Sequence, residues 1–310
     1  MLLNEEDVRA VLRMEELIPA MKEALRNLSA GRVDQPLRVV LPIPEHNGFF
    51  GVMPAYGGPL GAKLVTFFPN NKGIHTHHAM ILLFRPETGE PLVTMDGRLI
   101  TEMRTAAVSA VATDVLARTD ASVLAILGSG VQARSHLEAL RTVRKFREIR
   151  VWSPRNANEF ARQFKITSAT CAEEAVRNAD VIVVATAATT PVLKGDWLSA
   201  GAHINAVGAT RPNWRELDDD LLRRARIYVE SREAAMKESG DVIAAGQIVA
   251  EIGEVIAGSK DGRESDEEIT LFKSVGVAVE DIVAANLVYQ RAKERSGHPG
   301  EGLSTQPNRE

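Results

Sequence analysis

The first thirty residues carry two apolar stripes at the spacing of amphipathic helices. Val8, Val11 and Leu12 form the first stripe, and Asn4 stands where a helix N-cap is expected. The second stripe consists of Leu17, Met21, Leu25 and Leu28. It ends before Gly31, a residue suited to a helix C-terminus. We expect two packing helices here and assign them no chemistry.

The period then changes to the alternation of half-buried strands, up to about residue 96. The predicted strands are Leu37–Ile43, Phe49–Pro54, Ala62–Phe68, Ala79–Phe84 and Pro91–Met95. Gly, Pro and Asn separate them, and no long helical pattern interrupts them. This segment therefore predicts an antiparallel or mixed sheet, followed by a helix over Thr101–Ala117.

Strands and helices alternate in the next part of the chain. After Val123–Leu127 and its helix, the predicted strands are Glu148–Trp152, Lys165–Ser168, Val181–Thr186, His203–Val207 and Ile227–Val229. Helices are expected over Asp241–Gly258 and Glu267–Ala292, and a polar tail over Arg295–Glu310. Such alternation predicts the α/β class, with a doubly wound parallel sheet of Rossmann type. The earlier strands would then form a second, α+β domain with a mostly antiparallel or mixed sheet.

A glycine-rich motif joins the first strand of this alternating series to its helix. Gly128 and Gly130 follow the apolar run directly, and Ala133 comes three residues later. In this context Gly128 allows a tight turn, Gly130 allows close approach of a pyrophosphate, and Ala133 allows helix and strand to pack. The free N–H groups of the new helix would hold the phosphates. The motif predicts a dinucleotide site.

The end of the next predicted strand distinguishes between the two nicotinamide cofactors. An NAD site places a carboxylate here, roughly 20 residues beyond the glycines, to bind the ribose hydroxyls. This chain has Ser153, Arg155 and Asn156 and no acid. A guanidinium and a hydroxyl suit a 2′-phosphate, which a carboxylate would repel. We expect NADPH rather than NADH, although Arg155 alone also fits an ordinary solvated turn.

Three basic residues stand where a purely structural role is awkward. Lys63 alternates with core positions of its strand, and Arg104 lies on the apolar stripe of a helix, in what would be its first turn. The helix dipole disfavours a cation there unless an anion lies beside it. Arg38 shares a strand face with Val40. Singly, each fits a packing residue with a buried stem, whereas together they indicate a pocket for a small carboxylate.

The histidines at 75, 77 and 78 raise the question of a metal site. His75 and His77 would share a face of a strand, but no third ligand is nearby in the sequence. A structural zinc site needs four ligands, so we expect no metal and favour a histidine hydrogen bond near the cofactor.

Composition excludes several classes of partner. The formal net charge of −4 gives no electrostatic reason to expect nucleic acid or an anionic membrane surface. The single cysteine, Cys171, permits no internal disulfide, and no apolar run is long enough to span a membrane. The acidic start of the chain is unlike a signal peptide, so we expect a cytoplasmic protein.

Several motifs resemble those of one family, and they extend from about residue 37 to about residue 286. They are Ala62-Lys-Leu-Val-Thr-Phe67, Met95-Asp-Gly-Arg-Leu-Ile-Thr101, Arg104-Thr-Ala-Ala-Val-Ser109, Leu127-Gly-Ser-Gly-Val-Gln-Ala133, Gly201 to Asp218, Lys237-Glu-Ser-Gly-Asp241 and Phe272-Lys-Ser274. The chain resembles the ornithine cyclodeaminase/mu-crystallin family, and within it the mu-crystallin-type ketimine reductases. The resemblance implies a substrate and dimerisation domain over residues 1–115, with residues 287–310 packing back on it. It also implies a Rossmann NADP-binding domain over residues 116–286, and a homodimer.

The resemblance also implies roles for matching positions. Arg38, Lys63 and Arg104 match residues that hold the substrate carboxylate, and Glu238 matches a residue of the same pocket. With the motif residues, the expected cofactor contacts are His77, Arg104, Thr105, Gly128, Ser129, Gly130, Val131, Gln132, Ser153, Arg155, Asn156, Thr186, Val207 and Ser274.

Thr210 is the most informative departure from the family pattern. Cyclodeaminases carry an aspartate acid–base group at this position, whereas a threonine hydroxyl cannot act as a carboxylate base near pH 7. It can still position a water or an imine. Ornithine cyclodeamination is therefore disfavoured, and Lys63 and Thr210 become the candidate catalytic residues.

The resulting hypothesis is an NADPH-dependent reductase of cyclic ketimine carboxylates such as pyrroline- or piperideine-2-carboxylate, which are small imino acids. Lys63 is the candidate proton donor, although a carboxylate-binding role alone fits equally well. The alternatives are an amino acid dehydrogenase of the alanine dehydrogenase type and an NADP-binding, crystallin-like protein with little turnover.

Overall fold

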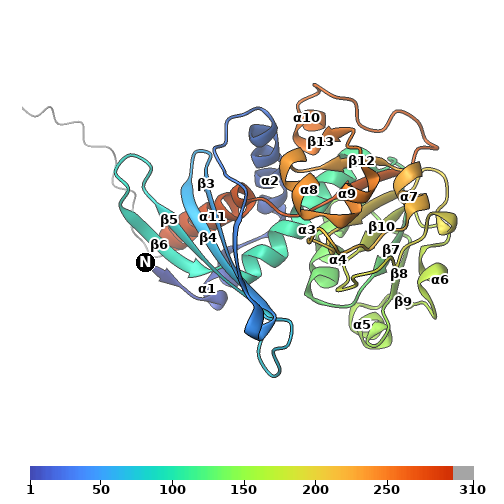
Figure 1. Cartoon of the computed structure of the whole chain (residues 1–310), viewed down its shortest axis with the longest axis horizontal. Helices are drawn as coiled ribbons and strands as arrows, with labels where there is room; N and C mark the ends of the chain where they lie inside the picture. The colour runs from blue at the N-terminus through green and yellow to red at the C-terminus, as the bar shows by residue number, and fades with distance from the viewer. Residues whose placement is uncertain (296–310) are drawn as a thin grey trace, which may run out of the picture.

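The computed structural model describes residues 1–295 and contains two β-sheets with a long buried helix between them (Figure 1). That helix is α3 (Arg98–Leu116), and most of its residues are buried. It contacts β5 of one sheet and β11 and β14 of the other, because apolar and small side chains cover nearly its whole circumference.

The first sheet is mixed, as predicted. In spatial order its strands are β1 (Leu2–Leu3), β6 (Pro91–Asp96), β5 (His77–Phe84), β4 (Leu60–Phe67), β3 (Gly48–Tyr56) and β2 (Val39–Ile43). The pair β1–β6 is parallel and the other pairs are antiparallel. In the register of the sheet, Lys63 lies between Met53 and Ile81, both buried. The lysine therefore points to the apolar face of its strand, as the alternation predicts.

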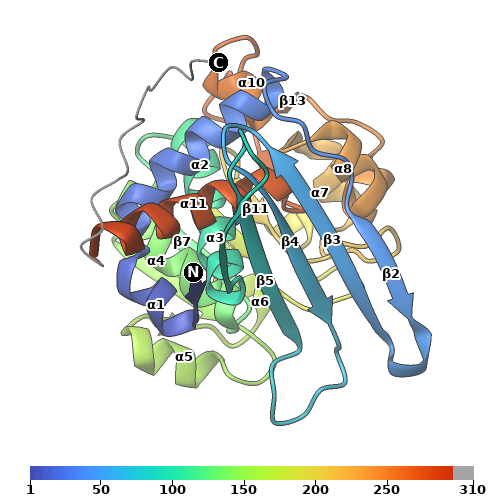
Figure 2. The ribbon, with the colours of Figure 1, turned by 90° about the vertical axis from the view of Figure 1, so that its left-hand side faces the viewer.

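Four helices pack on this part of the chain. They are α1 (Glu5–Val11), α2 (Met14–Ser29), α3 and α11 (Ala278–Arg295). Asn4 forms a capping box with Asp7 at the start of α1. The last helix, α11, contacts β3, β4 and β5, and Figure 2 shows these strands in front of it. The outer face of the sheet carries the row Val52, Leu64 and Met80.

The second sheet is entirely parallel, which confirms the doubly wound architecture. Its order is β13 (Ala250–Glu251), β12 (Arg226–Val229), β14 (Thr270–Lys273), β11 (His203–Ala206), β10 (Val181–Val184), β7 (Val123–Leu127), β8 (Glu148–Trp152) and β9 (Thr167–Ser168). Its helices are α4 (Val131–Val143), α5 (Ala157–Phe164), α6 (Ala172–Val176), α7 (Asp219–Arg224), α8 (Arg232–Glu238), α9 (Gly240–Ala245) and α10 (Ile252–Ile256). The central strands β7, β10 and β11 are fully buried.

Two predicted helices were wrong in part, because each predicted segment also contains a strand. The segment Asp241–Gly258 contains most of α9, the strand β13 and α10, and Glu267–Ala292 begins with the strand β14. A short strand buried on both faces has no alternation, so its apolar run looks the same as part of a buried helix. The helix predicted from Thr101 begins earlier, at Arg98, whose N–H donates to the side chain of Asp96.

The division into domains at residue 116 stays a prediction. The first sheet is formed within residues 2–96 and the second within residues 123–273. The end of α11 contacts α2, with Arg291 bound to Glu16, whereas the rest of the predicted returning segment, residues 296–310, lies outside the described residues. Within residues 1–295, no helix has the length and apolar character needed to cross a bilayer.

Candidate active site

A cavity of about 800 Å³ lies between the two sheets. Its wall combines strand ends of both sheets with the starts of α3 and α4 and the turn after β14. Twelve of the predicted site residues line it: Arg38, Lys63, His77, Arg104, Thr105, Val131, Gln132, Thr186, Val207, Thr210, Glu238 and Ser274. The sequence predictions therefore converge on one cavity, which has the size of a ligand pocket.

The glycine loop lies between β7 and α4, where the motif places it. Gly128 has φ +120°, and a Cβ there would lie 2.3 Å from the carbonyl oxygen of Ala185. Gly130 is the N-cap of α4, has no side-chain cap, and would have open space around a Cβ. The first N–H groups of α4 therefore remain available to an anion, and the side-chain oxygen of the neighbouring Gln132 is buried without a partner among the described residues.

The predicted 2′-phosphate residues lie beside this loop and outside the cavity lining. Ser129 Oγ is 2.8 Å from Ser153 Oγ, and the N–H of Asn156 donates to Ser153 Oγ at 3.2 Å. Arg155 is exposed in the same turn. The structure thus groups Gly128, Ser129, Gly130, Ser153, Arg155 and Asn156 at the carboxyl ends of β7 and β8.

Lys63 is almost completely buried at the cavity wall, with 2% of its surface exposed. Its Nζ donates to Asp281 Oδ2 at 2.5 Å. Burial lowers the pKa of Lys63 to about 8, because the carboxylate of Asp281 only partly offsets the loss of water and the repulsion from Arg104. A lysine with this pKa is still protonated at neutral pH and releases its proton more readily than a solvated one.

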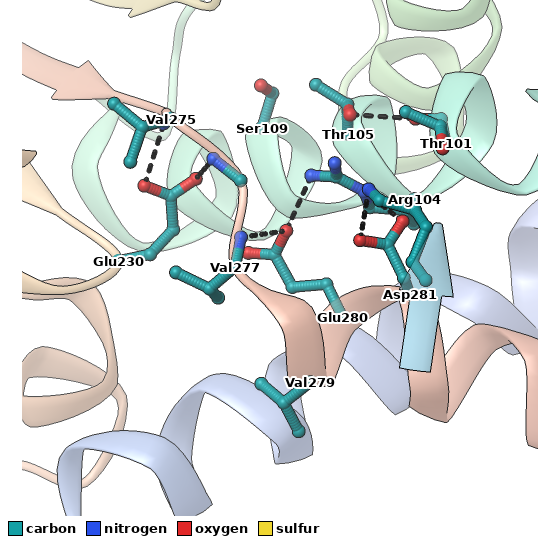
Figure 3. Close-up of polar contacts among 12 residues, drawn as sticks. Thr101, Arg104, Thr105, Ser109, Glu230, Val275, Val277, Val279, Glu280 and Asp281 are labelled. Atoms are coloured by element: carbon teal, nitrogen blue, oxygen red, sulfur yellow. Dashed lines mark hydrogen bonds and ion pairs between the residues drawn. The ribbon is translucent and has the colours of Figure 1, made fainter. Parts of the chain in front are cut away.

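Arg104 is held by the buried carboxyl groups of Glu280 and Asp281 at the start of α11 (Figure 3). Its Nε donates to Asp281 Oδ1 at 3.0 Å, and its Nη1 donates to Glu280 Oε2 at 2.6 Å. Because α3 begins at Arg98, Arg104 lies in the second turn, so the first-turn argument was wrong. The anion expected beside it is nevertheless present as Asp281, and Glu280 is a second acceptor. Among residues 1–295, Nη2 has no hydrogen-bond acceptor, and Arg104 lines the cavity, so Nη2 remains available to a ligand there.

Arg38 is bound to the turn between β14 and α11. Its Nη2 donates to the carbonyl oxygens of Val275 and Gly276 at 2.7 and 2.6 Å, and it lies 2.8 Å from Glu238 Oε2. Glu230 holds the N–H groups of the same two residues, each at 3.2 Å. The turn is therefore fixed on both sides, and Arg38 lies just before β2 rather than within it.

The other predicted residues differ in burial and in whether their polar groups already have hydrogen-bond partners. His77 begins β5, and burial lowers its pKa to about 4, so the ring is neutral. Thr105 Oγ1 donates to the carbonyl of Thr101, and Thr186 Oγ1 donates to Glu216. His75 precedes the strand and is exposed, so it does not share a strand face with His77. Among the described residues, no three His, Cys, Asp or Glu side chains form a metal-binding group.

Thr210 lies on the loop after β11, and contacts of the nearby Gly208 with buried side chains hold this loop in place. Ala209 has φ +49°, an uncommon conformation for a residue with a side chain. The buried Lys273 donates to the carbonyl of Gly208, and a Cβ at Gly208 would meet Glu216 Oε1 at 2.4 Å. The hydroxyl-bearing Thr210 is thereby presented to the cavity.

Sequence reasoning missed the acids that organise the site. Asp281, Glu280 and Glu230 are fully buried, and no strand or helix pattern distinguishes them from solvated helix or loop residues. The one available signal was the pair Glu280-Asp281 within a largely apolar stretch. Arg211 was also missed. Its guanidinium lies 4.8 Å from the ring centre of Phe49 and 4.9 Å from that of Trp214, at the cavity wall.

The sequence as a whole matches one family. The model of the ornithine cyclodeaminase/mu-crystallin family matches residues 1–296. The chain belongs to this family. Among curated relatives, the ketimine reductase mu-crystallin of Mus musculus is 50% identical over 301 residues, covering 93% of this chain and 96% of the relative.

Solved structures of the ornithine cyclodeaminase/mu-crystallin type share the fold. The Δ1-pyrroline-2-carboxylate reductase of Thermococcus litoralis, solved in complex with NADH and L-proline, has a TM-score of 0.91 and 40% identity, covering 96% of this chain and 98% of that one. An archaeal alanine dehydrogenase dimer with bound NAD has a TM-score of 0.91 and 38% identity, covering 98% and 99%. The family resemblance inferred from the motifs is confirmed.

Proposed function

We propose that the protein is an NADPH-dependent reductase of cyclic ketimine carboxylates such as pyrroline- or piperideine-2-carboxylate. The observation that carries the proposal is the pair of buried cations, Lys63 and Arg104, in one cavity with the N-terminal residues of α4. The mouse relative is a ketimine reductase and the Thermococcus litoralis protein is a Δ1-pyrroline-2-carboxylate reductase, and both reactions support this proposal.

The glycine loop fits a dinucleotide. Gly130 leaves open space at the uncapped start of α4, where the N–H groups suit a pyrophosphate. Ser153 and Arg155 suit a 2′-phosphate, which favours NADPH, although the neighbouring structures were solved with NADH or NAD. The cofactor, when bound, supplies the hydride that adds to the imine carbon.

The chain's own residues would bind and protonate the imine. The free Nη2 of Arg104 and the remaining donors of Arg38 would hold the substrate carboxylate, which orients the ring in the cavity. Lys63 Nζ would then give its proton to the imine nitrogen, and this proton together with the hydride added at the carbon converts the C=N bond into a CH–NH unit. Thr210 would hold a water or the imine through its hydroxyl.

Steady-state assays of the purified protein test the reaction. We expect oxidation of NADPH with a cyclic ketimine, slower oxidation of NADH, and no proline or ammonia from L-ornithine. The similarity to the archaeal alanine dehydrogenase makes that activity the second candidate, and pyruvate with ammonia is its test. Oxidation with pyruvate and ammonia but with no cyclic ketimine would replace our proposal, and binding of NADPH without turnover would indicate a crystallin-like protein.

The proposal includes a cytoplasmic homodimer. The outer row Val52, Leu64 and Met80 is apolar, and Met80 is 47% exposed. The archaeal alanine dehydrogenase is described as a dimer. Light scattering after gel filtration should give twice the mass of the chain. Met80→Glu should shift the mass towards the monomer, whereas Lys145→Glu, an exposed change beside the second sheet, should not.

A further inference from the structure

One buried carboxylate connects the two cations of the proposed substrate site. Asp281 has no exposed surface, and each of its oxygens has a different partner. Oδ2 accepts from Lys63 Nζ at 2.5 Å, and Oδ1 accepts from Arg104 Nε at 3.0 Å. Lys63 comes from β4 and Arg104 from α3. Asp281 therefore connects a residue of the strand with a residue of the helix.

Asp281 is itself held firmly. It lies in the first turn of α11, where the helix dipole favours a negative charge. The neighbouring N–H of Val279 donates to Gln35 Oε1 at 2.9 Å, and Ile282 is buried against the first sheet. Burial alone would raise the pKa of Asp281, but Arg104 and Lys63 together hold that pKa below its ordinary value. The carboxylate is therefore charged and has a fixed position.

The charges around Lys63 leave Asp281 with a distinct role. The charged and titratable groups that act on the lysine are Asp281 on α11, Arg104 on α3 and Arg38 before β2, and His77 on β5 lies near them. Of these, Asp281 alone is negative, and the two arginines disfavour a protonated lysine. Without this carboxylate, an ammonium and a guanidinium would be buried together without their shared counter-charge.

We propose, on the basis of the reductase function above, that Asp281 is a positioning residue for imine reduction. It keeps Lys63 protonated and fixes the ammonium at a set separation from the guanidinium of Arg104. The proton donor and the carboxylate clamp then face the substrate as one rigid unit. Both Nζ hydrogens not used by Asp281, and Nη2 of Arg104, remain for the substrate.

Glu280 provides a matched control from the same turn. It is equally buried and binds Arg104 and the N–H of Val277, at 2.6 and 3.3 Å, but it does not contact Lys63. Glu280→Gln preserves an acceptor for Arg104. Any effect that passes through Lys63 should therefore appear in Asp281→Asn and not in Glu280→Gln.

The test is the dependence of kcat and KM on pH, from pH 6 to 10, with piperideine-2-carboxylate and NADPH. In the native protein we expect kcat/KM to fall above about pH 8, as Lys63 loses its proton. In Asp281→Asn this fall should move at least one pH unit lower, with kcat reduced at least tenfold at pH 8 and less at pH 6. Asp281→Glu should keep the native pH dependence with a lower kcat, and Glu280→Gln should not move it.

A second readout does not depend on turnover. Calorimetric binding of L-proline to the NADP⁺ complex should weaken above about pH 8 in the native protein and at a lower pH in Asp281→Asn. If the native protein reduces no cyclic ketimine, the proposed function fails, whereas this titration still tests the role of Asp281. An equal loss at every pH in Asp281→Asn overturns the positioning role. If Asp281→Asn does not fold, an unchanged kcat in Asp281→Glu overturns it.

Discussion

The hydroxyl oxygen of Ser129 lies 2.8 Å from the hydroxyl oxygen of Ser153, which joins the glycine loop to the end of β8. The loop suited to a pyrophosphate and the turn suited to a 2′-phosphate are thus adjacent parts of one surface. A substitution in the glycine loop is therefore expected to alter the contacts of the turn after β8 with the cofactor, and the reverse.

Arg155→Ala should weaken NADPH binding by about tenfold and leave NADH binding nearly unchanged, because an exposed guanidinium adds a modest amount to a phosphate contact. Ser153→Asp should reverse the preference, since its carboxylate would repel the phosphate and accept from a ribose hydroxyl. Fluorescence titration with both cofactors measures this. Lys145→Ala removes an exposed cation before β8 and is the control. An unchanged NADPH to NADH ratio in both variants would contradict the assignment.

Replacing each glycine of the loop by alanine should have a different effect, on stability at Gly128 and on cofactor binding at Gly130. Gly128→Ala forces a side chain into φ +120° and towards the carbonyl oxygen of Ala185, so we expect a lower melting temperature. Gly130→Ala meets open space in the protein and should keep the native melting temperature but weaken NADPH binding, because its methyl group enters the cofactor's position. Thermal unfolding and cofactor titration of both variants test this contrast. Equal stability of the two variants would argue against it.

Gly276 should be needed for the position of Arg104. A Cβ at Gly276 would lie 2.6 Å from Arg104 Nη1, and its φ is +73°. Gly276→Ala should raise KM for the ketimine by roughly 10–100-fold, the range for a lost hydrogen bond to a charged group, with little effect on cofactor affinity. Gly89 has the same φ and nothing near its Cβ position, so Gly89→Ala bears the same backbone cost without reaching the site. Identical KM values for the two variants would show that backbone strain alone matters.

Glu280 should make stability depend on pH. Burial raises the pKa of Glu280 to about 8, from an ordinary value near 4.5, even though Arg104 opposes the shift. Because the pKa is higher in the folded than in the unfolded protein, proton binding stabilises the fold fully at a pH below the unfolded-state pKa. This contribution is lost as the pH rises to about 8. Relative to Glu280→Gln, the native protein should lose free energy of unfolding as the pH rises from about 4.5 towards about 8. Urea unfolding of both proteins at about pH 5, 6.5 and 8 measures the difference, and parallel values would contradict it.

The parts of the fold that were predictable have a periodic signal. The strands between residues 48 and 96 alternate because one face is buried, so the period of two predicts that Lys63 lies on that buried face. The glycine loop was predictable because its residue types are dictated by backbone geometry. The strand β14 was missed because four residues buried on both sides carry no period.

Among the charged residues of the site, only the positively charged ones could be predicted from the sequence pattern. A cation in an apolar stripe is unusual, so Arg104 could be singled out from the sequence. Its partner Asp281 comes 177 residues later and looks like an ordinary acid at a helix start. Pairings between such distant segments depend on how the two sheets pack, which no local pattern encodes.

The turn from Ser274 to Val277 has a consequence for how such a chain can change in evolution. It leaves a strand of the parallel sheet and enters the helix that lies on the other sheet, while Arg38 and Glu230 hold its backbone from opposite sides. Recombination that replaced one half of the molecule with a distant counterpart would break these contacts. We therefore expect the two halves to be inherited together. Insertions should be tolerated in exposed hairpin loops such as residues 85–90 and excluded from this turn.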